Sequence, residues 1–129
     1  IRMTQADGTD VRQLDFFIEV DRSTETISRI VERMQAYVAY FATGGYAKRQ
    51  GVANAEPRDF PFRVLWTFKT KARRESFLRA CREHVKPIQK MAWAGVFDFA
   101  VRDPFGPCWR RPVDVNQADE LPLFVRPSN

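Results

Sequence analysis

Residues 14–25 read LDFFIEVDRSTE, the pattern of a β-strand that ends in acids and leads directly into a helix. Successive side chains along a strand point to opposite faces of the sheet. One face of this strand is predicted to be apolar: Leu14, Phe16, Ile18 and Val20. The other face is predicted to carry acids and one aromatic ring: Asp15, Phe17, Glu19 and Asp21. We expect the rest of the chain to be arranged around this strand.

Glu19 and Asp21 form a pair of carboxylates at the end of that strand, about 6 to 7 Å apart along the backbone. Two acids this close are difficult to keep ionised without a cation or a basic partner. The pair is therefore a candidate site for a hard divalent cation, Mg²⁺ or Mn²⁺. The alternative is a solvated strand end, since acids and capping residues commonly precede helices.

The composition favours one compact domain, residues 1–129, with an anionic partner. The chain is 44% hydrophobic and 13% aromatic, and 21 Lys and Arg against 16 Asp and Glu give a net charge of +5 and a pI of about 9.6. A basic balance of this kind favours binding to nucleic acid. Because the chain begins at Ile1, already in strand-like sequence, we expect it to be a fragment of a longer protein or a processed product.

Several classes of protein and site are disfavoured. The two cysteines, Cys81 and Cys108, do not indicate a disulfide framework, which fits a reducing cytoplasm. No apolar run approaches the roughly 20 residues that span a bilayer, and the first residues lack a signal-peptide pattern. The only histidine, His84, excludes a zinc cluster and a histidine-based triad within this chain. No Gly-rich phosphate loop is present.

The first half of the chain is predicted to contain a hairpin and a helix. Asp7-Gly8 has the composition of a tight turn between two strands. Ser23 or Thr24 is predicted to cap a helix, because apolar residues then recur at three- and four-residue spacing as far as Gly44-Gly45. Residues 46–61 show no periodicity and are predicted to form a long loop.

The second half is predicted to supply two strands, a helix and a tail. Residues 62–70 alternate as a strand does, and Thr70 can cap a helix from Lys71 to about Lys86. Residues 93–101 are predicted to form another strand, and 103–129 an extended, proline-interrupted tail at an edge of the fold. The resulting order, β-β-α-β-α-β, predicts an α/β fold with a mixed sheet flanked by helices.

The chain resembles the plasmid replication-relaxation family. The resemblance rests on residues 16–25, a following helix with Arg33 and Tyr37, FRVLW at 62–66, and DPFGPCW at 103–109. That family is similar to a branch of the PD-(D/E)XK restriction-endonuclease-like superfamily. The resemblance implies a restriction-endonuclease-like core and a DNA-binding or DNA-processing role in plasmid replication or relaxation.

The resemblance also implies catalytic positions, and the chain departs from them. Active members use an Asp on one strand, then an acid and a Lys two residues apart on the next, to bind magnesium and position water. Glu19 matches the second acid, but Asp21 stands where the Lys belongs, and no acid precedes Asp7. An anion cannot supply the positive charge that assists attack on a phosphodiester. Lys69 is a candidate displaced lysine and Gln35 a candidate for orienting water, although a residue near a helix cap and a solvated helix face are the respective alternatives.

Basic side chains on the second helix and in the tail are candidate phosphate contacts, with a solvated surface as the alternative. They are Arg73, Arg74, Arg79, Arg82, Lys86, Arg110 and Arg111. The leading hypothesis is a DNA-binding or DNA-processing module with a degenerate catalytic site and weak affinity for Mg²⁺ or Mn²⁺. A catalytically inactive protein-interaction domain and an active nuclease with a rearranged site are the alternatives. Neither the DNA preference nor the oligomeric state follows from the sequence.

Overall fold

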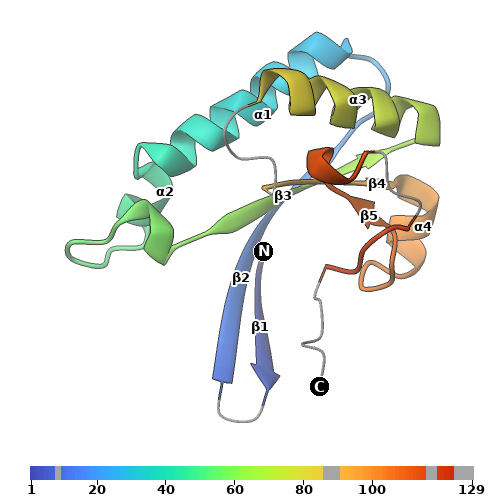
Figure 1. Cartoon of the computed structure of the whole chain (residues 1–129). Coiled ribbons are helices and arrows are strands. Elements are labelled where there is room, and N and C mark those ends of the chain that lie inside the picture. Colours follow the sequence, from blue (N-terminus) through green and yellow to red (C-terminus); the bar gives the residue numbers. More distant parts are fainter. Residues whose placement is uncertain (8–9, 86–90, 116–118, 124–129) are drawn as a thin grey trace.

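The computed structural model describes residues 1–7, 10–85, 91–115 and 119–123, which form a mixed α/β fold (Figure 1). The sheet of the described residues has the order β1-β2-β3-β4-β5. Its strands are β1 (Arg2–Asp7), β2 (Asp10–Val20), β3 (Phe62–Phe68), β4 (Ala92–Val96) and β5 (Trp109–Arg110). The three central strands are parallel, and each edge strand is antiparallel to its neighbour. The predicted mixed sheet is confirmed.

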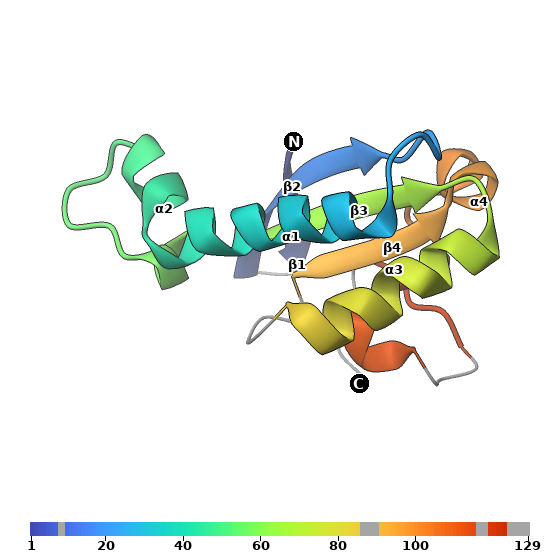
Figure 2. The ribbon, with the colours of Figure 1, turned by 90° about the horizontal axis from the view of Figure 1, so that it is seen from above.

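Two helices cover one face of this sheet, α1 (Ile27–Ala42) and α3 (Lys71–His84) (Figure 2). Each connects parallel neighbours, α1 between β2 and β3 and α3 between β3 and β4. The core between helices and sheet contains fully buried aromatic and aliphatic side chains: Ile30, Met34, Val64, Trp66, Phe68, Phe77 and Leu78. Burial of this apolar surface is the main source of stability.

A smaller cluster lies on the opposite face, where α4 (Phe97–Arg102) and the last described residues pack. It contains Phe16, Leu65, Trp93, Ala100, Cys108, Trp109 and Leu123. Ile18 and Val20 lie beside this cluster on β2 but are about half exposed, so the predicted apolar face of the strand is only partly covered. Both cysteines are free and buried, and burial raises the pKa of Cys81 to about 12 and that of Cys108 to about 11.

The boundaries of the first helix differ from those predicted. Ser23 has a positive φ of 62°, and the capping residue is Thr26, whose Oγ1 accepts a hydrogen bond from the Arg29 backbone N–H at 3.3 Å. Gly44, with φ 80°, precedes a second short helix, α2 (Gly45–Arg49). The predicted loop at 46–61 is therefore partly helical, and it also contains the 3-10 helix η1 (Pro57–Asp59).

The second half confirms one cap and corrects one strand. Thr70 caps α3 as predicted, its Oγ1 accepting from the Arg73 N–H at 3.2 Å. The strand predicted at 93–101 ends at Val96, where α4 begins, because Ala100 packs into the second cluster. The predicted tail is not uniformly extended, since it contains β5 and the 3-10 helix η2 (Pro112–Asp114). Of the described residues in this segment, β5 forms one edge of the sheet.

Candidate functional site

The candidate site lies at the sheet edge where the parallel strands β2 and β3 end and helices α1 and α3 begin (Figure 2). The register pairs Glu19 with Trp66, and the Asp21 N–H donates to the Thr67 carbonyl oxygen at 2.9 Å. Sites in open α/β sheets commonly form at this edge, beside the helix N-termini. The sheet thus places the predicted carboxylates where a functional site is expected.

Glu19 is held by two side chains of α1. The Tyr37 hydroxyl donates to Oε1 of Glu19 at 2.6 Å, and Nη1 of Arg33 lies 3.3 Å from Oε2. Arg33 and Tyr37 are four residues apart, which puts them on one face of the helix. Burial and the hydrogen bond to Glu19 raise the pKa of Tyr37, so its phenol stays a protonated donor at neutral pH. Each carboxylate oxygen of Glu19 therefore has one partner on α1.

Asp21 has its own partner, Arg73 from the first turn of α3. The Arg73 guanidinium donates to both carboxylate oxygens of Asp21 and to the backbone carbonyl of Glu25. Arg33 in turn donates to the Glu25 carboxylate at 2.6 and 2.7 Å. The side chain of Asp21 is only 2% exposed, whereas those of Glu25 and Arg33 are more than a third exposed. We call Glu19, Asp21, Glu25, Arg33 and Arg73 the edge network.

In the edge network, arginines pair with the two carboxylates for which the sequence suggested a metal ion. Bidentate guanidinium–carboxylate pairs use the same lone pairs that a hard cation requires. Within the described ranges, no group of three His, Cys, Asp or Glu side chains is arranged to hold a metal. A divalent ion at Asp21 would have to compete with the bidentate Arg73 pair, and one at Glu19 with a single contact from Arg33.

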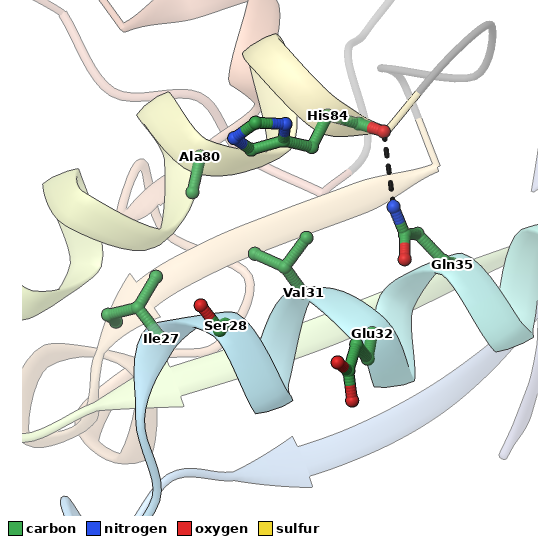
Figure 3. A pocket seen from close by; sticks show the side chains of 7 residues that line it. All are labelled: Ile27, Ser28, Val31, Glu32, Gln35, Ala80 and His84. Atoms are coloured by element: carbon green, nitrogen blue, oxygen red, sulfur yellow. Dashed lines mark hydrogen bonds between the residues drawn. The ribbon is translucent and has the colours of Figure 1, made fainter.

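Gln35 lies away from the two acids. Its Nε2 donates to the His84 carbonyl oxygen at 3.2 Å and so links α1 to the last turn of α3 (Figure 3). An open cavity of about 390 Å³ lies between the two helices at this point. It is lined by Ile27, Ser28, Val31, Glu32, Gln35, Ala80 and His84. This geometry does not support the predicted role of Gln35 beside Glu19.

Lys69 also fails to join Glu19. Lys69 directly follows β3, and by strand alternation it shares a face with Leu65 and Thr67. Leu65 packs in the cluster on the face opposite the helices. Glu19 is paired with Trp66, which points to the helix-covered face. Among the described residues, Lys69 makes no side-chain hydrogen bond or ion pair, and it is exposed.

Several predicted phosphate contacts are engaged within the protein. Arg74 is 1% exposed and pairs with Glu75 at 2.9 Å and Glu120 at 2.6 Å. Arg110 is also buried and lies 3.8 and 3.7 Å from the same two acids. We call these four residues the interior network. Burial withdraws both arginines from any phosphate, which corrects that part of the prediction.

The remaining predicted contacts differ in accessibility. Arg111 pairs with Asp114 at 2.7 Å, and its guanidinium lies 5.4 Å from the centre of the Trp93 ring. Arg73 belongs to the edge network. Arg79 and Arg82 are exposed on α3, as predicted. Lys86 lies outside the described residues.

A set of exposed cations lies around the edge network: Arg22, Arg29, Lys69 and Lys71. The sequence indicated Lys69 only as a candidate catalytic lysine, and it did not indicate a role for Arg22 or Arg29. Within the described part of the chain, the side chains of all four form no ion pair or hydrogen bond. Neither α1 nor α3 has an acid in its first turn, so the partial positive charge of each helix N-terminus is not offset there. Part of the signal was available in the sequence, because Arg22 directly follows a predicted strand and Lys71 opens a predicted helix. We call Arg22, Arg29, Lys69 and Lys71 the edge cations.

Comparison with known proteins gives one match. A family model described as replication-relaxation matches residues 1–55, which is less than half of the chain. The matched region contains β1, β2, α1 and α2, and with them Glu19, Glu25 and Arg33, but not Arg73. No curated protein and no solved structure matches the chain. In the described residues, no helix has the length and apolar composition needed to cross a membrane.

Proposed function

We propose that this chain is a DNA-binding module with a role in plasmid replication or relaxation, and that it contacts the phosphate backbone at the edge where β2 and β3 end. The observation that carries the proposal is the exposure of the edge cations beside acids that are already paired. This edge carries six positive side chains, the four edge cations together with Arg33 and Arg73. It carries three acids, Glu19, Asp21 and Glu25, so positive charge is in excess. The similarity of residues 1–55 to the replication-relaxation family supports the same conclusion.

We further propose that the nuclease-like site implied by the family resemblance is degenerate. Asp21 occupies the position of the motif lysine, and its charge is neutralised by Arg73. Glu19 accepts hydrogen bonds from Tyr37 and Arg33, so a metal would have to compete with both partners for its oxygens. Losing one preorganised charge typically costs a hundredfold or more in rate. The expected affinity for Mg²⁺ or Mn²⁺ is weak, and no useful cleavage of DNA is expected.

The position of the DNA contact is tested by comparing two double variants of equal charge. Lys69→Gln/Lys71→Gln removes two edge cations, and Arg79→Gln/Arg82→Gln removes two exposed charges from the outer face of α3. Fluorescence anisotropy with a labelled duplex is measured from about 50 to 200 mM salt. We expect the edge variant to bind about tenfold more weakly and to lower the salt slope by about 2, since each lost phosphate contact removes about 0.9.

Three outcomes contradict the proposal: salt-independent binding, a larger loss in the Arg79→Gln/Arg82→Gln variant, and no binding at all. The last would favour the protein-interaction domain, for which the departure at Asp21 is the supporting observation. Catalysis is tested separately with supercoiled plasmid and Mn²⁺. Nicking that disappears in both Glu19→Ala and Asp21→Ala would make this an enzyme with a rearranged site.

A further inference from the structure

We propose that the chain forms a two-fold symmetric dimer through α4. This helix lies at the periphery of the molecule, beyond β4 and β5 (Figure 1). Ala100 packs into the second cluster, while Phe97, Phe99 and Val101 are 41%, 60% and 62% exposed. Three large apolar side chains in six residues are thus presented to water by a helix that the sheet holds in place.

Two residues of β2 enlarge this apolar surface. Ile18 and Val20 are half exposed and lie on the same sheet face as Leu65, which packs in one cluster with Ala100. At about 100° per residue, Phe97 and Val101 lie on one side of Asp98 and Arg102 around α4, and Phe99 lies on the other side. We call these three apolar residues, with Ile18 and Val20, the α4 surface. It leaves the equivalent of two to three whole side chains in water, on the order of 400–500 Å². That is about half of the roughly 800 Å² that each partner contributes to a standard interface.

The charges on α4 indicate that the partner is a second copy. Asp98 and Arg102 are exposed one helical turn apart, yet in the described structure they pair neither with each other nor with another residue. Two α4 helices that meet antiparallel about a two-fold axis place Asp98 of each copy against Arg102 of the other. The surface is therefore complementary to itself in both charge and apolar character. This inference does not depend on DNA binding.

The oligomeric state is measured by sedimentation equilibrium of the whole chain from about 1 to 200 µM. A dimer with a dissociation constant in roughly the micromolar range is expected, the weak end for interfaces of this size. Phe99→Asp should raise that constant at least tenfold, whereas Val52→Asp, at a 56% exposed residue outside the α4 surface, should leave it unchanged. A wild-type monomer at 200 µM, or a dimer that Phe99→Asp does not weaken, overturns the proposal.

A charge exchange tests the antiparallel arrangement without touching any apolar side chain. Asp98→Arg and Arg102→Asp each create two like-charge contacts across the axis, so each variant alone should dissociate at least tenfold more readily. An equimolar mixture of the two restores both opposite-charge contacts and should form a heterodimer with the wild-type constant. Circular dichroism checks that each variant is folded. Mixtures that stay monomeric, or single variants that dimerise normally, overturn the proposal.

Discussion

The edge network and the interior network use the same chemistry to different ends. Each contains two arginines and two or three carboxylates, and consecutive residues of α3 contribute to them, Arg73 to the first and Arg74 to the second. One helical step of 100° separates the two side chains. Arg73 keeps contact with solvent beside the edge cations, whereas Arg74 is buried against Glu75 and Glu120. Burial thus separates charges that can meet a ligand from charges that hold the chain together.

The largest expected effect is the loss of stability on removing Arg74. Arg74→Ala should lower the free energy of unfolding by about 3–5 kcal/mol, because Glu75 and Glu120 would lose their closest partner inside the protein. Urea denaturation measures the change. Arg79→Ala, an exposed arginine on the same helix, is the control and should change stability by no more than about 0.5 kcal/mol.

A loss below about 1 kcal/mol in Arg74→Ala would contradict the structural role of the interior network. In that case Arg110, which lies 3.8 and 3.7 Å from the same two acids, would have to carry the pairing alone. The double variant Arg74→Ala/Arg110→Ala distinguishes the two explanations. If Arg110 compensates for the loss of Arg74, then Arg110→Ala should lower the free energy of unfolding more in the Arg74→Ala background than in the wild type.

An intermediate effect is expected at Asp21, where stability and DNA affinity should change in opposite directions. Asp21→Asn should cost about 2 kcal/mol, the worth of charge-assisted hydrogen bonds, since Arg73 can turn toward solvent when the pair is lost. Freeing Arg73 should strengthen DNA binding about threefold by removing one negative charge from the edge. Urea denaturation and duplex anisotropy measure the two quantities.

The matched control for Asp21 is Glu120→Gln, which removes one negative charge from the interior network. It should lower stability and leave DNA affinity unchanged, because Arg74 and Arg110 stay buried. Equal gains in DNA affinity in the two variants would mean that net charge alone sets binding. The distinction between the two networks would then fail.

Local patterns predicted the elements whose signals lie within a few residues. The Thr70 cap and the positions of strands β2 and β3 followed from capping chemistry and alternation, which are local properties. The strand predicted at 93–101 was cut short because Ala100 packs into a cluster with Trp109 and Leu123, far along the chain. Tertiary packing overrides local strand propensity in such a segment.

The two networks show that local sequence also predicted only part of the site. The prediction placed Glu19 and Asp21 at the strand end correctly, because sheet geometry alone determines that position. It assigned Arg73 and Arg74 the same role, that of phosphate contacts. Nothing nearby in the sequence reveals that Glu120 approaches Arg74 in the folded chain. Arg33 and Tyr37 could have been assigned to Glu19 from their four-residue spacing, whereas Gln35, between them, points elsewhere.

The smallest expected effect concerns acid stability and an ion pair outside both networks, which joins β1 to β2. The Arg2 guanidinium bonds to Asp15 at 2.8 and 3.1 Å, and Tyr46 donates to the same carboxylate at 2.5 Å. The bond from Arg2 holds the pKa of Asp15 below its usual range; burial opposes this shift and Tyr46 assists it. Asp15 is thus a buried acid with a half-exposed arginine, intermediate between the two networks.

The sign of the pH dependence follows from that lowered pKa. Unfolding returns Asp15 to an ordinary pKa of about 3.9, so below about pH 4 the unfolded chain binds more protons at this residue than the folded chain. The stability that Asp15 contributes is present above that value and is lost as the pH falls through the folded pKa. Asp15→Asn should therefore reduce the slope of the unfolding free energy against pH between about pH 4 and pH 2. The reduction corresponds to less than one proton taken up on unfolding.

Urea denaturation at a series of acidic pH values measures this slope. Asp114 supplies the comparison, because Arg111 lowers its pKa against the opposing effect of burial, and part of the slope should persist in Asp15→Asn. The double variant with Asp114→Asn should be flatter than either single variant. An unchanged slope in Asp15→Asn would show that the Arg2 pair persists in the unfolded chain or forms in neither state. In that case a half-exposed arginine such as Arg2 would not make its carboxylate partner stabilise the folded state. Only a buried arginine such as Arg74 would do so.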